Sequence, residues 1–266
     1  PPTAAPPRGA ARSRVAGRVG RVVSSAMAGE RNAVLNATAL ELLAEPAEVA
    51  EVFHAALERP GAGVRGHWTL HELLRRSRLY DELVNALASP NPLTQAAAAR
   101  ICGAARMSES IEWLADLVHD ANPRVHEAAV RSLAHHGGRR AVEQLMASSD
   151  RIPLYRLAIA LSKAASDLDI EALMRRPVSE EAAVATVLAS GLRRDALRVS
   201  PLLGIAHDRR WPKRVRVAAC KALAAIGERT SLDGVKRLSQ SDPDPDVKAA
   251  AERAHRRLVR RAVAQQ

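Results

Sequence analysis

The chain has 266 residues and a mass of 28.6 kDa, with 47% hydrophobic and only 2% aromatic residues and a formal net charge of +11. It contains no run of about eighteen consecutive apolar residues, so no segment of it is expected to span a membrane. The two cysteines, Cys102 and Cys220, are too few for a disulfide framework or a zinc site, and we expect two buried free thiols. A core of Ala, Leu and Val with little aromatic volume favours closely packed helices.

The positive charge is concentrated at the two ends of the chain. Residues 1–31 carry a net charge of +5 and residues 191–266 a net charge of +10, whereas residues 32–190 carry −4. Electrostatic attraction of an acidic partner is therefore expected at the ends rather than in the middle of the chain.

Residues 1–31 combine Pro, Gly, Ala, Ser and Arg and predict a basic, largely disordered tail in which residues 12–27 form a short helix. The segment lacks the apolar stretch of a signal peptide. Its six Arg against Glu30 suit an anionic membrane surface. We expect a cytoplasmic protein, which an apolar anchor upstream of Pro1 would place at the cytoplasmic face of a membrane.

Helical periodicity begins near Asn32 and predicts an N-terminal helical cap over residues 32–67. Pro46 opens a second helix in this cap, and Pro60 ends it. Residues 61–66 are rich in glycine but lack the Lys and Ser/Thr of a phosphate-binding loop, so they indicate an ordinary connection.

From Trp68 onward the chain repeats a unit of about 30 residues. The run NPLTQAAAARICG at residues 91–103 returns as NPRVHEAAVRSLA at residues 122–134. Each unit predicts a first helix, a short turn with Asp, Asn or Pro, and an alanine-rich second helix. The recurring alanines are Ala97, Ala128, Ala158, Ala182, Ala218 and Ala250, and three of them are followed nine residues later by Gly137, Gly191 and Gly227. This period predicts an α-solenoid over residues 68–266.

Three runs resemble HEAT repeats of the phycobilisome-lyase-like subtype: DANPRVHEAAVRSLAHHG at residues 120–137, KRVRVAACKALAAIG at residues 213–227 and DPDPDVKAAAERA at residues 242–254. The pattern of that subtype is an acidic turn, then Val, a charged residue, a small pair, and Leu before Gly. The resemblance covers roughly residues 68–261. It implies an all-α fold, a right-handed superhelix of about six helix pairs whose second helices line a concave face.

The C-terminal repeats hold the candidate partner-binding residues. The run DRRWPKRVR at residues 208–216 surrounds Trp211 with cations, and Trp and Arg are the residue types that most often anchor interfaces. More arginines follow at helical spacing near the C-terminus. Together the candidates are Arg209, Arg210, Trp211, Lys213, Arg214, Arg216, Arg253, Arg256, Arg257 and Arg260.

Each of these groups also has a purely structural interpretation. Trp211 can fold back over the neighbouring repeat, and the terminal arginines can be the solvated surface of the last helix. Asp120, Asp208 and Asp242 recur at the turn between helices, so an Asp–Arg ladder from repeat to repeat competes with a charged binding face. Only part of the basic side chains is therefore expected to be available to a partner.

The sequence shows no residues in the context of a catalytic centre. Repeated His-Glu pairs on HEAT helices, which hold two irons in deoxyhypusine hydroxylase, are a resemblance carried at the matching repeat position by His126-Glu127 alone. One pair cannot build a two-metal site, and neither cysteine has a neighbouring His. We therefore predict no enzyme activity, no catalytic residue, no metal, no cofactor and no small-molecule substrate.

The sequence favours a non-enzymatic scaffold or adaptor that binds a protein partner through its concave or C-terminal basic surface. The alternative is nucleic-acid binding, because HEAT-like DNA glycosylases are similar in size and basicity. Trp113 with Asp116 is the one pair that resembles an aromatic and a carboxylate of such a site, but scarce aromatic residues disfavour base stacking. The repeat subtype also leaves open a bilin-lyase-like chaperone.

Overall fold

A computed structural model of the chain describes residues 79–264 and, before them, residues 20, 21, 24, 25, 28, 72 and 75. The predicted cap at residues 32–67 lies outside the described residues, as does most of the predicted tail at residues 1–31. Within the tail, the backbone N–H of Ala28 donates to the carbonyl oxygen of Ser24 at 3.0 Å, a helical hydrogen bond. In the described part of the chain no helix is long and apolar enough to cross a membrane. The membrane-surface location stays a prediction.

The chain divides into two compact units, Pro1–His136 and Gly137–Gln266. The described helices of the first unit are α6 (Leu79–Leu87), α7 (Pro92–Ala104), the 3-10 turn η1 (Ser108–Ser110), α8 (Ile111–Leu117) and α9 (Pro123–His136). Those of the second are α10 (Gly138–Ala147), α11 (Leu154–Ala164), α12 (Asp167–Arg175), α13 (Glu180–Arg193), η2 (Ala196–Arg198), α14 (Val199–His207), α15 (Lys213–Ile226), η3 (Arg229–Ser231), α16 (Leu232–Ser241) and α17 (Pro245–Val263).

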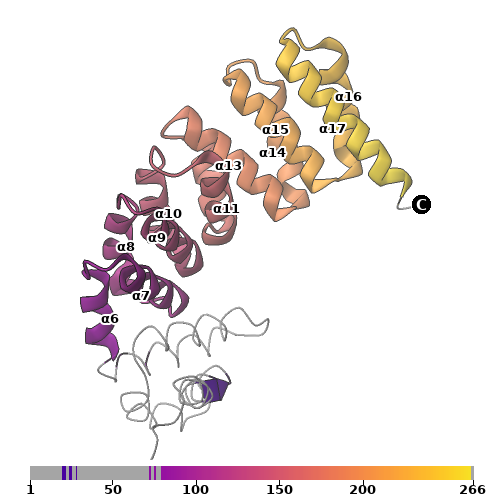
Figure 1. The fold of residues 1–266 in the computed structure, drawn as a ribbon. Helices are drawn as coiled ribbons and strands as arrows, with labels where there is room; N and C mark the ends of the chain where they lie inside the picture. The colour runs from indigo at the N-terminus through magenta and orange to yellow at the C-terminus, as the bar shows by residue number, and fades with distance from the viewer. Residues whose placement is uncertain are drawn as a thin grey trace, which may run out of the picture. The chain divides into compact units, whose positions relative to one another are not determined.

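These helices form pairs, and the second helices of successive pairs pack on one another. In the second unit each of α10, α12, α14 and α16 contacts the helix that follows it, while α11, α13, α15 and α17 make a continuous layer (Figure 1). In the first unit α7 packs on α9 in the same way. Residues 79–264 contain no strand. The prediction of an all-α solenoid of helix pairs is confirmed, while the right hand of its superhelix stays a prediction.

Short polar side chains begin several second helices, as the Asn-Pro and Asp-Pro runs predict. Asn91 accepts a hydrogen bond from the backbone N–H of Leu93 before α7, and Asp244 accepts one from Asp246 before α17. Each cap satisfies a backbone donor that the first helical turn leaves unpaired, and the proline that follows needs no donor.

Glycine has two structural roles here, at turns with positive φ and at a close helix crossing, and the sequence pattern did not distinguish them. Gly137 and Gly227 have φ angles of 65° and 83° and lie at turns between helices. Gly191 lies instead inside α13, where a Cβ atom would stand 2.6 Å from the Cα of Ala222 on α15. The second helices therefore approach so closely that only glycine fits at this crossing.

Candidate functional site

Arg216, one of the predicted partner-binding residues, is buried near the start of α15. Its side chain is 5% exposed and forms an ion pair with Asp242, whose side chain is 3% exposed. Its Nε also donates to the carbonyl oxygen of Ala206 at 2.9 Å, and Asp242 accepts the N–H of Asp244 at 3.0 Å. Arg216 thus ties the end of α14 to the α16–α17 turn. Its assignment to a binding surface is corrected, because burial removes the guanidinium from solvent.

The other cations around the start of α15 are exposed but paired. Lys213 reaches Asp246 on α17 at 2.8 Å, and Arg214 reaches Glu181 on α13 at 2.8 Å. These pairs connect the N-terminal ends of three neighbouring second helices. The Lys213 ammonium lowers the pKa of Asp246, as expected for a carboxylate beside a cation. The predicted Asp–Arg contact between repeats is therefore present as the pair Arg216–Asp242, and these two exposed pairs add contacts whose acids lie at helix starts.

The turn before α15 holds the remaining candidates of the run DRRWPKRVR. Arg210 pairs with Asp208 at 2.9 Å, and its hydrogen bond holds the pKa of that carboxyl below its usual value. The backbone N–H of Trp211 donates to the carbonyl oxygen of Asp208 at 3.1 Å, and the Trp211 residue is half-buried. Arg209 is exposed. Both arginines of the turn are thus exposed, but Arg210 is paired within the turn and Arg209 has no ion-pair partner among residues 79–264.

The arginines of α17 lie opposite its buried stripe. The buried positions are Val247, Ala250, Ala251, Ala254, Leu258 and Ala262, and the exposed arginines are Arg253, Arg256, Arg257 and Arg260. Arg256 pairs with Glu252 at 3.0 Å, and the Nε of Arg260 lies 3.5 Å from the carbonyl oxygen of Arg256. Within residues 79–264, Arg253 and Arg257 have no ion-pair partner.

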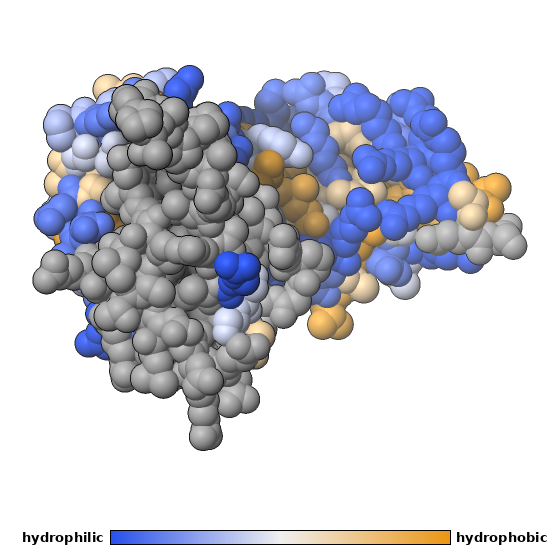
Figure 2. Space-filling view, turned by 60° about the horizontal axis from the view of Figure 1, so that its bottom comes forward, coloured by the Kyte–Doolittle hydropathy of each residue, from blue (hydrophilic) through white to orange (hydrophobic). Residues whose placement is uncertain are grey.

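A further exposed cation, Lys221 on α15, was missed by the sequence analysis. Lys221 follows Ala218 by three residues, as Arg253 follows Ala250, so the repeat spacing carried the signal. Since α15 packs directly on α17, equivalent positions lie on the same side of the layer. We call Lys221, Arg253 and Arg257 the basic face. Figure 2 shows that hydrophilic residues cover most of the C-terminal repeats on the side in view, with apolar patches between them.

The residues considered for catalysis have structural contacts. The Nδ1 of His126 lies 2.7 Å from the carbonyl oxygen of Val118, and Glu127 pairs with Arg131 at 2.6 Å. Burial raises the pKa of the Cys102 thiol to about 12 and that of Cys220 to about 11, which keeps both thiols protonated. Among the described residues, no group of three or more His, Cys, Asp or Glu side chains is placed to hold a metal.

Comparison with known families identifies the repeats. Residues 80–164 and 169–256 match the family model of HEAT repeats. The chain belongs to the HEAT-repeat family. The phycobilisome-lyase-like subtype stays a prediction because the match is to HEAT repeats in general. A comparison with curated proteins finds no match.

Among solved structures, this HEAT chain is similar to human deoxyhypusine hydroxylase in complex with glycerol. The likeness covers 93% of this chain and 98% of that one, with 17% identity and a TM-score of 0.37. At those values it carries no residue or activity from one protein to the other. It does correct one prediction, that this chain is not an enzyme, because the matched structure is an enzyme. Helical repeats of this kind do not exclude catalysis, and we no longer infer its absence from the fold.

Proposed function

We propose that this HEAT scaffold holds a protein partner with an acidic surface on the basic face of Lys221, Arg253 and Arg257, extended by Arg260. The observation that carries the proposal is that Arg253 and Arg257, on one helix, are exposed without an ion-pair partner among residues 79–264, as Arg209 and Arg260 also are, whereas the five other candidate cations are paired. Cations that are already paired contribute little to a new contact. Unpaired cations attract an acidic partner and favour its orientation.

The surroundings of the basic face favour a protein partner over a nucleic acid. On the same layer of second helices, Glu181 and Asp246 are paired with Arg214 and Lys213, so these pairs offer a continuous phosphate backbone little net attraction. Neither α15 nor α17 contains Trp, Tyr or Phe on which a base could stack. Leu192, 39% exposed on the adjacent α13, adds apolar surface of the kind that protein interfaces bury.

Charge reversal tests this proposal against a matched control. The test variant changes Lys221, Arg253 and Arg257 to Glu. The control changes Arg229, Lys236 and Arg237 to Glu, which alters the net charge equally on η3 and α16, where these three residues are exposed. The intact protein and both variants are purified from nuclease-treated native extract, and the partner is identified by mass spectrometry and its affinity measured. We expect the test variant to lose at least about tenfold in affinity and the control to lose little.

Three results would count against the proposal. Equal affinity of the test variant and the unaltered protein would remove the basic face from binding. Equal losses in both variants would indicate a general effect of net charge rather than a face. Material that binds the unaltered protein in untreated extract and is lost entirely after nuclease treatment would identify a nucleic acid as the partner.

A further inference from the structure

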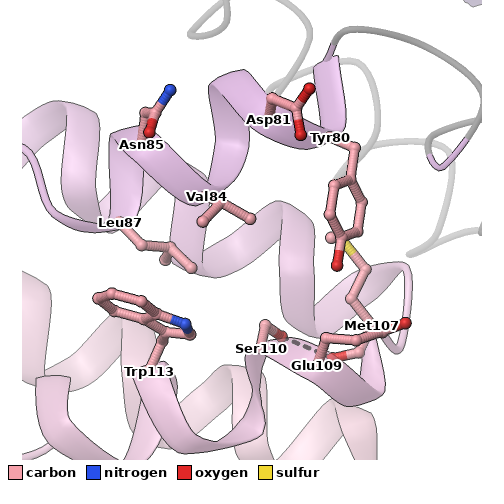
Figure 3. A pocket seen from close by; sticks show the side chains of 9 residues that line it. All are labelled: Tyr80, Asp81, Val84, Asn85, Leu87, Met107, Glu109, Ser110 and Trp113. Carbon is pink, nitrogen blue, oxygen red and sulfur yellow. Dashed lines mark hydrogen bonds between the residues drawn. The ribbon is translucent and has the colours of Figure 1, made fainter.

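The described part of the first unit contains a pocket of about 440 Å³ between α6 and the η1–α8 segment. Figure 3 shows Tyr80, Asp81 and Asn85 coming from α6, with Met107, Glu109 and Trp113 on the other side of the pocket. Val84, Leu87 and Ser110 complete its lining. Two of the six aromatic residues of this aromatic-poor chain therefore line one pocket.

The residues that line this pocket include two carboxylates and no Lys or Arg, while Arg75 lies near enough to Tyr80 to lower the pKa of its hydroxyl. The sequences of α6 and of η1 with α8 hold five carboxylates and no Lys or Arg. Asp81 and Glu109 belong to the pocket lining itself. Partial burial and, after it, the charge of Glu109 raise the pKa of the Tyr80 hydroxyl, so that this ring stays neutral at physiological pH.

Aromatic faces and carboxylates attract the same kind of ligand, an organic cation. A cation over the face of Trp or Tyr is held by the ring quadrupole, and Trp gives the strongest attraction. Trp113 is 45% exposed, so its indole is accessible from solvent. The carboxylates of Asp81 and Glu109 and the amide oxygen of Asn85 are hydrogen-bond acceptors, which a guanidinium with its five N–H donors can use and a fully methylated ammonium cannot.

We propose that the pocket formed by Tyr80, Trp113, Asp81 and Glu109 binds an arginine side chain of a peptide segment in a partner protein. The guanidinium stacks on the aromatic rings while the carboxylates accept its N–H groups. This site is independent of the basic face, since it has the opposite charge and lies in the other unit. The scaffold can therefore hold an acidic and a basic partner at two separate places.

The test uses the full chain labelled with ¹⁵N at tryptophan, in which the three indole N–H signals of Trp68, Trp113 and Trp211 are assigned by substitution. The probe is the peptide acetyl-Gly-Arg-Gly-amide, and the control probe carries the neutral isostere citrulline in place of arginine. We expect the Trp113 signal to shift and saturate with the arginine peptide and not with the citrulline peptide, while the Trp211 signal stays in place.

Two double variants test which carboxylates bind the arginine peptide. Asp81→Asn with Glu109→Gln should lower the affinity for the arginine peptide by about tenfold or more, because both acceptors lose their charge. Glu82→Gln with Asp116→Asn removes two charges from α6 and α8 outside the pocket lining and should lower the affinity for the arginine peptide by less than about threefold. Equal binding of the citrulline peptide, an unmoved Trp113 signal, or equal losses in the two variants would overturn the proposal.

Discussion

Replacing Arg216 with Met should lower the free energy of unfolding by about 3–5 kcal/mol, the usual result of removing one partner of a buried ion pair. The reason is the carboxylate of Asp242, whose side chain is 3% exposed and would remain buried without its counter-charge. The carbonyl oxygen of Ala206 would lose its donor as well. Urea denaturation followed by circular dichroism measures the change.

Two further variants separate this buried pair from ordinary surface pairs. Arg216→Met combined with Asp242→Asn should recover much of the loss, because no charge is left buried and the Asn oxygen still accepts the N–H of Asp244. Arg210→Met breaks the exposed pair with Asp208 and should leave the unfolding midpoint nearly unchanged. If Arg216→Met and Arg210→Met had equal effects, the account of Arg216 as a tie between repeats would be wrong.

Two glycine-to-alanine substitutions in the second unit should change stability in opposite directions. Gly191→Ala places a Cβ atom 2.6 Å from the Cα of Ala222, so α13 and α15 must move apart. We expect a loss of about 1–3 kcal/mol, the range for overpacking a well-packed core. The backbones at this crossing leave no room for a methyl group to rotate away.

Gly204 on α14 provides the matched control. A Cβ atom there would meet nothing within 4 Å, and Gly204 is exposed inside a regular helix. Gly204→Ala should therefore raise stability by roughly 0.5–1 kcal/mol, because alanine loses less backbone entropy on forming a helix. Urea midpoints that move in the same direction for both variants would contradict the proposed close approach of α13 and α15.

The fold could be predicted because the same local signals recur in every repeat. The alanine spacing fixes the second helices, and runs such as Asn91-Pro92 and Asp244-Pro245 mark their starts through side-chain caps and proline. Gly191 shows the limit of that approach. Its spacing from Ala182 equals that of Gly227 from Ala218, but only the packed structure shows that one glycine lies inside a helix and the other ends one.

The candidate site could be predicted only as a region. Arg216 and Lys248 occupy the same repeat position, two residues before Ala218 and Ala250. Arg216 is buried because the turn of the next repeat supplies Asp242, whereas Lys248 is exposed and no later turn exists among the described residues. Whether a cation is buried, paired or available thus depends on the neighbouring repeat. The prediction about catalysis went wrong for a related reason: a repeat pattern specifies packing and says little about chemistry.

The central claim, that a partner sits on the basic face of this HEAT scaffold, is tested most directly by site-specific photo-crosslinking in living cells. A photo-reactive amino acid replaces Lys221 on α15 in one version of the intact protein and Lys236 on α16 in another, both exposed positions of the second unit. We predict that the version altered at Lys221 gives a crosslinked protein species on illumination and that the version altered at Lys236 does not. A crosslinked protein from Lys236 with none from Lys221 would contradict the claim and place the partner on the first helices instead.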